Sequence, residues 1–301
     1  MLVLSGASGL VGRYLCDDLL ARQIPFKVLG RSPASFLQEL NIPFCFFDLS
    51  LPFQDEYLVR SFFEGVDCLI HIAALMPHPS RKLTDYYLYN SVASKVLYDL
   101  CSESGVNHFI YLSGSNILQP IDGVVTRHSC YSCSLRHPPY LSSKIAGELL
   151  LLNSSSATKL TVLRPSSVYG SGIRTGLFRN LYDSLARRTP LALSHNGLWS
   201  ADFIYAGDVA KAILRLIDNS VSGVFNIGSG VSSCSFDVAS NLVSVLGADD
   251  DLIVLEPFDG DPNSIGSLPV VSVDQFHCLM GHYPMSLSEG LDHAFREYGF
   301  L

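Results

Sequence analysis

Tyr140 and Lys144 stand four residues apart, a spacing at which two side chains can act together on one proton. In a helix, residues four apart lie one turn apart and project from the same face. A phenol has an ordinary pKa of about 10, and a neighbouring ammonium favours its ionised form. We therefore expect Lys144 to lower the pKa of Tyr140, so that the phenol can exchange a proton near neutral pH.

Ser115 is the third residue of this candidate site. It follows the apolar run 109–112, which has the length of a buried strand, and would lie at the carboxyl end of that strand, where open α/β sheets bind their ligands. Its hydroxyl could hydrogen-bond the substrate oxygen that Tyr140 protonates or deprotonates. A Tyr–Lys pair at this spacing also occurs by chance in helices, so the interpretation depends on a second motif.

The first twelve residues supply that motif, with glycines at Gly6, Gly9 and Gly12. Residues 1–4 are apolar, as in a buried parallel strand, and apolar residues recur at helical spacing from Val11 onward. At such a junction the first glycine permits a tight turn, the second lets the backbone approach a pyrophosphate, and the third lets helix pack on strand. The sequence therefore predicts a dinucleotide phosphate site before a helix, although glycines at turns are common.

Further elements alternate along the first half of the chain. We expect the helix at 140–156 to turn Ile145, Leu149 and Leu152 inward. Strands separated by helices of ten or more residues imply right-handed crossovers and a parallel sheet with helices on both faces. The predicted strands are 26–29, 44–47, 69–72, 109–112 and 160–163, and the other long helix is 83–104.

The second half is richer in Ser, Gly and Pro. It carries predicted helices at 175–187, 207–218, 235–246 and 285–298 and a strand at 224–227. The predicted fold is α/β, a Rossmann-type doubly wound parallel sheet with a smaller C-terminal α/β lobe that binds the substrate. We expect residues 1–170 to form the dinucleotide-binding domain, with 202–228 returning to it, and residues 171–301 to form mainly the lobe.

The composition of the chain limits the kinds of partner that it can bind. The chain has 301 residues and a net charge of −8 with no basic run, which argues against nucleic acid. Apolar stretches fall short of the roughly 20 residues that a membrane span needs, and Met1 leads directly into the first strand, so we expect a cytoplasmic protein. The eight cysteines are scattered, and Cys130 and Cys133 lack a second pair, so no metal site is expected.

Several stretches together resemble the extended short-chain dehydrogenase/reductases, the nucleotide-sugar epimerase/dehydratase family. Their order and spacing carry the resemblance, which extends over nearly the full length. The stretches are Gly6–Gly12, Asp48–Leu49, His71–Ala74, Asn90, Phe109–Ser115, Tyr140–Lys144, Arg164–Pro165, Val168–Gly170, Asp202–Tyr205, Asp208–Ala210 and Val224–Gly228.

The resemblance implies a role for each matching position. Ser115, Tyr140 and Lys144 would be catalytic, and Tyr140 and Lys144 would also contact the cofactor. It implies a homodimer formed through the helices at 83–104 and 140–156. The cofactor residues would be Gly6, Ser8, Gly9, Leu10, Val11 and Gly12 at the pyrophosphate, Asp48 and Leu49 at the adenine, Ala73 and Ala74 on the ribose side, and Pro165 and Val168 beside the nicotinamide.

The end of the second predicted strand bears on the choice of dinucleotide. An acidic residue there would hold the 2′-hydroxyl of NAD, whereas this chain has Arg31 and Ser32, which could accept a 2′-phosphate. We therefore expect NADP in preference to NAD; the alternative is a surface arginine. In the family that the chain resembles, ketone reduction typically consumes NADPH. Dehydratases of that family carry an acidic pair where this chain has Asn116 and Ile117, so dehydration is disfavoured.

The substrate residues are less well defined. In the family, an arginine that binds a substrate phosphate stands where this chain has Ala201. An asparagine of the family stands where this chain has Ser167. Arg174 and Trp199 are candidate substrate contacts, unless they are a solvated charge and a packing residue. The leading hypothesis is reduction of a 4-keto sugar nucleotide. The alternatives are a 4-epimerase with tightly bound NAD, a reductase of a ketone without a nucleotide, and a non-catalytic NADP-binding sensor or scaffold.

Overall fold

The computed structural model describes residues 1–33, 35–52, 56–132, 137–248 and 250–298. The chain forms two compact units. The first comprises Met1–Gln119, Arg127–Arg164 and Ala210–Phe225, and the second comprises Pro120–Thr126, Pro165–Val209 and Asn226–Leu301.

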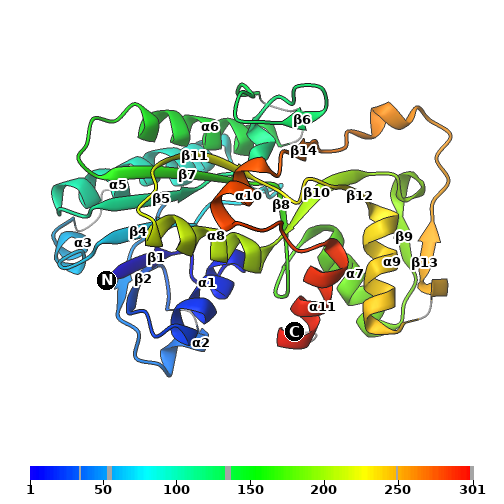
Figure 1. Ribbon diagram of the computed structural model, residues 1–301, viewed down its shortest axis with the longest axis horizontal. Helices are drawn as coiled ribbons and strands as arrows, with labels where there is room; N and C mark the ends of the chain where they lie inside the picture. Colours follow the sequence, from blue (N-terminus) through cyan, green and yellow to red (C-terminus); the bar gives the residue numbers. More distant parts are fainter. Residues whose placement is uncertain (34, 53–55, 133–136, 249, 299–301) are drawn as a thin grey trace. The chain divides into compact units, whose positions relative to one another are not determined.

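A seven-stranded sheet organises the first unit, in the order β11-β7-β5-β4-β1-β2-β3 (Figure 1). Each pair from β3 to β7 is parallel. The strand order reverses beside β1, which lies between β2 and β4, and this is where doubly wound sheets bind ligands. The predicted Rossmann-type sheet is confirmed. Its strands are β1 (Leu2–Ser5), β2 (Phe26–Gly30), β3 (Phe44–Phe46), β4 (Cys68–His71), β5 (His108–Leu112), β7 (Lys159–Pro165) and β11 (Gly223–Ile227).

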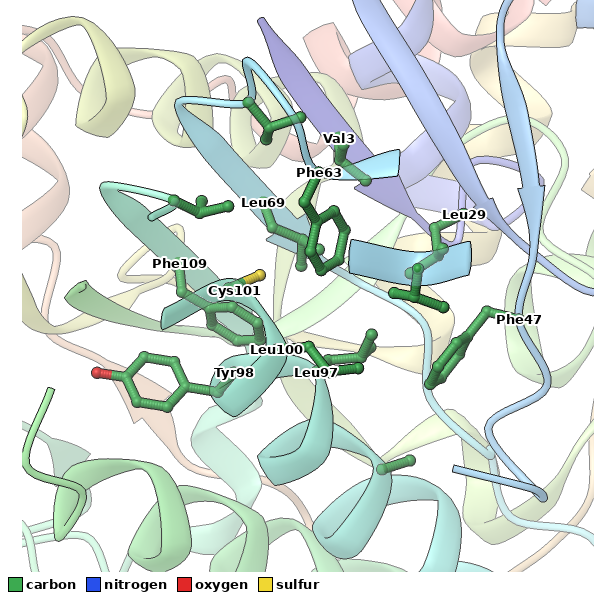
Figure 2. Packing of buried hydrophobic residues seen from close by; sticks show 14 of the residues in the cluster. Val3, Leu29, Phe47, Phe63, Leu69, Leu97, Tyr98, Leu100, Cys101 and Phe109 are labelled. Atoms are coloured by element: carbon green, nitrogen blue, oxygen red, sulfur yellow. The ribbon is translucent and has the colours of Figure 1, made fainter. Parts of the chain in front are cut away.

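Both faces of this sheet are covered, which explains why its strands read as continuous apolar runs. Val3, Leu69 and Phe109 point to the face that α5 covers, where Leu97 and Cys101 are fully buried (Figure 2). Alternate residues of a strand point to opposite faces of a sheet, and α1 covers the second face (Figure 1). Helices of this unit are α1 (Leu10–Ala21), α2 (Ser35–Gln38), α3 (Glu56–Phe62), α4 (Leu83–Tyr87), α5 (Ala93–Glu103) and α6 (Pro138–Leu152), while α8 (Ala206–Asp218) begins in the second unit.

The predicted helix at 83–104 is interrupted. A π-helical turn, η1 (Leu88–Val92), joins α4 to α5. Asn90 lies in this turn, and its side chain accepts a hydrogen bond from Leu75 N and donates to Leu75 O and Ser143 Oγ. The extra residue per turn lets Asn90 reach these partners, and π-turns often mark functional sites.

The described part of the second unit contains three small sheets and three long helices. Its elements are β6 (Val124–Val125), β8 (Ser167–Tyr169), α7 (Gly176–Arg187), β9 (Leu191–Leu193), β10 (Ser200–Tyr205), β12 (Ser232–Cys234), α9 (Ser235–Leu246), β13 (Ile253–Leu255), β14 (Val270–Val271), α10 (Asp274–Met280) and α11 (Leu287–Tyr298). The sheets pair β12-β10-β8, β13-β9 and β14-β6. Among the described residues, no helix has both the length and the apolar character to cross a membrane.

Asp202, on β10, ties this unit together. Its carboxylate is 1% exposed and accepts hydrogen bonds from the backbone N–H of Ser229, Gly230 and Val271 and from the hydroxyls of Ser166 and Ser229, all between 2.8 and 3.1 Å. These donors come from segments far apart in the sequence, so a single carboxylate fixes the loop after β11 and the start of β14.

Asp202→Ala should destabilise the protein by about 3 kcal/mol, because it leaves buried backbone donors without an acceptor. Chemical denaturation followed by circular dichroism measures the change. The matched control is Asp292→Ala in α11, which removes an exposed ion pair to Arg296 and should change the free energy of unfolding by less than about 0.5 kcal/mol. Equal effects of the two variants would contradict the role given to Asp202.

Candidate active site

The turn after β1 is closed tightly on itself. Gly6 has φ +83°, and its carbonyl accepts a hydrogen bond of 2.9 Å from Gly9 N. A Cβ added at Gly12 would lie 2.1 Å from Gly6 O, and one at Gly6 would lie 2.7 Å from Ala73 N, in the loop after β4. Gly6 and Gly12 thus have no space for a side chain, and the turn abuts the neighbouring strand's loop.

The start of α1 is suited to an anion. Its N-cap, Gly9, makes no side-chain capping bond, and the first turn carries no acidic residue. Ser8 and Gly9 are exposed, Leu10 is half-buried, and Val11 is buried. Backbone N–H groups at an uncapped helix start attract phosphate oxygens. The turn therefore fits the pyrophosphate of a dinucleotide.

The predicted adenosine residues follow the neighbouring strands β2 and β3. Arg31 and Ser32 are exposed just after β2. Asp48, after β3, accepts hydrogen bonds from Ser50 N, Ser50 Oγ and Tyr89 Oη. Burial opposes its charge, but these hydrogen bonds and the positive charge of Arg31 together lower the pKa of Asp48. Arg31 is therefore close enough to act on Asp48. Leu49 is buried, and Ala73 and Ala74 follow β4.

Lys144 is buried on α6. Only 2% of its surface is exposed, its Nζ donates a hydrogen bond of 2.8 Å to Leu112 O, and the same atom lies 4.1 Å from the centre of the Tyr111 ring. Burial lowers the pKa of Lys144 to about 7, an effect that the negative charge of Glu148 opposes. The ammonium is thus held against the end of β5.

Tyr140 precedes Lys144 by one turn of α6. Its ring packs edge-on against Tyr86 of α4, with centroids 6.4 Å apart. Burial raises the pKa of the Tyr140 phenol to about 12. This is opposite to the decrease expected from the sequence, because removal from water disfavours the phenolate.

Ser115 begins a short 3₁₀ turn, η2 (Ser115–Ile117), that packs on α6. It is buried, as is Ile117, while Asn116 is half-buried. Ser113, which the sequence analysis did not single out, lies two residues earlier. Its N–H donates to Leu163 O, while its Oγ is buried without a hydrogen-bond partner among the described residues. No sequence signal separates these two serines.

A buried ion pair lies behind Lys144 and was also missed. Glu148, one turn after Lys144, is fully buried and forms an ion pair with Arg164, on β7. Tyr131 Oη donates a hydrogen bond of 2.8 Å to Glu148. The repeat of four from Tyr140 through Lys144 to Glu148 is a signal that could have identified the acid, whereas nothing in the sequence pairs it with Arg164.

His71, Ser94 and Ser5 form a buried chain of hydrogen bonds. Ser94 Oγ donates to Asn90 O, so His71 Nε2 must donate to Ser94 Oγ, and His71 Nδ1 accepts from Ser5 Oγ at 2.6 Å. Burial, assisted by the charge of Lys144, lowers the pKa of His71 to about 3. His71 is therefore a neutral packing residue, not a proton carrier.

The predicted nicotinamide and substrate residues that remain belong to the second unit. Pro165 ends β7 and Val168 lies in β8. Trp199 packs against Phe203 with ring centroids 6.1 Å apart, and Arg174 is exposed before α7. Ala201 is fully buried within β10, so the position of the family arginine is enclosed here. Cys130 is exposed, and Cys133 lies outside the described residues.

The fold and the glycine turn together define the class of protein. A doubly wound parallel sheet with an uncapped glycine turn at its switch point is a dinucleotide-binding architecture. The model of the NAD dependent epimerase/dehydratase family matches residues 2–228, and the chain belongs to that family. It is an enzyme of the extended short-chain dehydrogenase/reductase type, as the resemblance implied.

Relatives with different reactions are similar to the chain. It is 25% identical over 284 residues to a Bacillus subtilis protein described as an uncharacterized UDP-glucose epimerase, and the match covers 87% of each chain. It is 23% identical to a dTDP-4-dehydro-6-deoxy-D-allose reductase of a Streptomyces species, over 98% of this chain and 95% of the other. The UDP-glucose 4-epimerase of Thermotoga maritima superposes with a TM-score of 0.80 at 22% identity, covering 99% and 98% of the two chains.

Gly12→Ala should destabilise the protein by about 2–3 kcal/mol and weaken dinucleotide binding at least about tenfold, because the new methyl group collides with Gly6 O. Denaturation and fluorescence titration measure the two effects. Gly30→Ala is the matched control, since a Cβ there meets nothing within 4 Å, and its stability should stay within about 1 kcal/mol of wild type. A Gly12→Ala protein as stable as the control would contradict the tight turn.

Proposed function

We propose that this enzyme is an NADP-dependent reductase of a 4-keto sugar nucleotide. One observation carries the proposal: Tyr140 and Lys144 share a face of α6 that packs against the carboxyl end of β5, in the unit whose glycine turn fits a dinucleotide. The bound cofactor would supply a hydride to the carbonyl carbon. The chain's own residues then have to supply a proton and hold the oxygen.

Tyr140 is the proposed proton donor. A phenol with a pKa of about 12 is protonated at neutral pH, so the resting site is ready to give a proton and not to take one. A carbonyl oxygen becomes a much stronger base as its carbon accepts a hydride, so it can take this proton. The protonated phenol is the form that the proposed reduction requires.

Ser115 and Lys144 have supporting roles in this proposal. Ser115 would hydrogen-bond the carbonyl oxygen and polarise it. Lys144, held by Leu112 O, would stabilise the phenolate left after proton transfer and bind the nicotinamide ribose. The contacts of Arg174 and Trp199 with the sugar nucleotide remain a prediction.

A 4-epimerase is the second candidate, favoured by the similarity to the Bacillus subtilis and Thermotoga maritima proteins. It would oxidise the sugar and return the same hydride. The experiment is a screen of 4-keto and parent nucleotide sugars with NADPH and NADH. A reductase consumes added cofactor in proportion to product, whereas an epimerase purifies with bound dinucleotide and interconverts parent sugars without net consumption.

We also propose a cytoplasmic homodimer. Leu149, Leu150 and Leu152 on α6 are each more than 40% exposed, as is Leu83 on α4, and α4 packs beside α6. Monomeric proteins rarely leave large contiguous apolar patches in water. A second copy of the chain would cover these leucines, at the helices that the family resemblance implies.

NADPH should bind at least about tenfold more tightly than NADH, because Arg31 can pair with the 2′-phosphate and no carboxylate ends β2. Fluorescence titration measures both affinities. Arg31→Ala should remove the preference by weakening NADPH alone. Arg22→Ala, at an exposed arginine after α1, is the control and should leave both affinities unchanged. Equal affinities in the wild type would remove the argument from Arg31.

Tyr140→Phe should lower turnover by at least about a hundredfold, the scale of a lost general acid, while cofactor affinity changes less than about threefold. Steady-state rates with the substrate found by the screen give the first number, and titration gives the second. Retained turnover would show that another group donates the proton. Loss of cofactor binding would point instead to a packing role for the ring.

A further inference from the structure

Glu148 continues the stripe of α6 that carries Tyr140 and Lys144. It lies one turn beyond Lys144 and is fully buried, so a carboxylate and an ammonium occupy the same buried helix face. Burying a carboxylate is costly unless its oxygens are hydrogen-bonded and its charge is balanced. The contacts of Glu148 meet both conditions.

Arg164 and Tyr131 hold the carboxylate in place. Arg164 Nε lies 3.0 Å from both oxygens of Glu148, and its Nη2 makes a further contact with Oε2. Tyr131 Oη donates to Oε2 at 2.8 Å and accepts from Arg164 Nη2 at 2.8 Å. The guanidinium also lies over the Tyr131 ring, 5.1 Å from its centre. The carboxylate is therefore fixed by the strand and by the segment before α6.

The ionisable groups that face Lys144 come from three elements. Tyr140 and Glu148 lie on α6, Tyr111 on β5 and His71 on β4. Burial raises the pKa of Tyr111 and lowers that of His71 to about 3, so both are neutral near pH 7. Glu148 is the carboxylate that acts on the ammonium among the described residues.

We infer that Glu148 is a positioning residue whose carboxylate, fixed by Arg164 and Tyr131, makes the buried Lys144 harder to deprotonate while leaving its Nζ bonded to Leu112 O. Arg164 has an essential part, because an unpaired Glu148 would draw the ammonium away from Leu112 O. The functional consequence rests on the proposed proton transfer by Tyr140 and Lys144. The electrostatic statement about Lys144 does not.

Removal of Glu148 and removal of Arg164 should shift the pKa of Lys144 in opposite directions. Without the carboxylate, Lys144 and Arg164 are two buried cations and the ammonium loses its proton more easily. Without the guanidinium, Glu148 acts on Lys144 uncompensated and the ammonium holds its proton more firmly. Without both, the local net charge is that of the wild type. A purely structural role for the ion pair would not produce this pattern.

The titration midpoint of Lys144 is the direct readout. The chain has only six lysines, so protein labelled with ¹³C-lysine gives a simple spectrum, and Lys144→Met assigns the signal of residue 144. Glu148→Gln should lower the midpoint by about one pH unit or more, the scale of a lost neighbouring charge. Arg164→Gln should raise it. The double variant should return close to the wild type, and Glu103→Gln, which removes an exposed partner of Arg60, should change nothing.

An unchanged or raised midpoint in Glu148→Gln would overturn the inference. If that variant does not fold, Arg164→Gln decides, because an unchanged or lowered midpoint there overturns it equally. These titrations use the whole 301-residue chain without substrate, so they stand even if the proposed reaction is wrong. With an active substrate, turnover of Glu148→Gln should fall off at a lower pH than that of the wild type on the alkaline side of the pH profile. Glu148→Asp should move this alkaline limb part of the way back.

Discussion

The buried face of α6 carries two charged side chains, and each of them requires a partner from the first unit. A helix against a sheet ordinarily buries an apolar stripe, but this one buries Lys144 and Glu148. An unpaired charge in such a place destabilises a protein by several kcal/mol, so each needs a partner that the sheet can provide. Leu112 O at the end of β5 serves the ammonium, and Arg164 on β7 serves the carboxylate. Adjacent strands of one sheet thus hold the two charges of one helix.

Close approach of α6 is the second consequence. A Cβ at Gly147 would lie 2.4 Å from Asn90 O and 2.9 Å from Tyr111 Oη, so only glycine lets the helix reach the π-turn and β5. Asn90 O in turn accepts hydrogen bonds from Tyr111 Oη and Ser94 Oγ. The π-turn therefore supplies an acceptor beneath the helix, and the Asn90 amide joins the loop after β4 to Ser143. These bonds fix the height and rotation of the face that carries Tyr140.

The sequence predicted what is local and missed what depends on tertiary partners. The glycine turn and the strands were readable because both faces of a parallel strand are buried. The inward face of α6 was predicted wrongly: Leu149 and Leu152 are exposed, because the prediction let apolar residues alone set the inward face, whereas Lys144 and Glu148 are among the residues that the helix buries. The π-turn at Asn90 could not be predicted, since its cause is hydrogen bonding to Leu75 and Ser143 from other segments.

Burial also sets which proton is available first. It moves the pKa of Tyr140 up to about 12 and that of Lys144 down to about 7, so near neutrality the phenol keeps its proton while the lysine exchanges its own readily. In the proposed reaction, Tyr140 would give its proton to a substrate oxygen, and the phenolate would then gain the attraction of the ammonium one turn away, which could return a proton to it. His71, neutral and hydrogen-bonded on both ring nitrogens, cannot take that part. Exclusion of water around α6 thus sets the resting protonation states of the proposed site, and the charge balance that we infer for Glu148 and Arg164 would set the pH range of the proposed reaction.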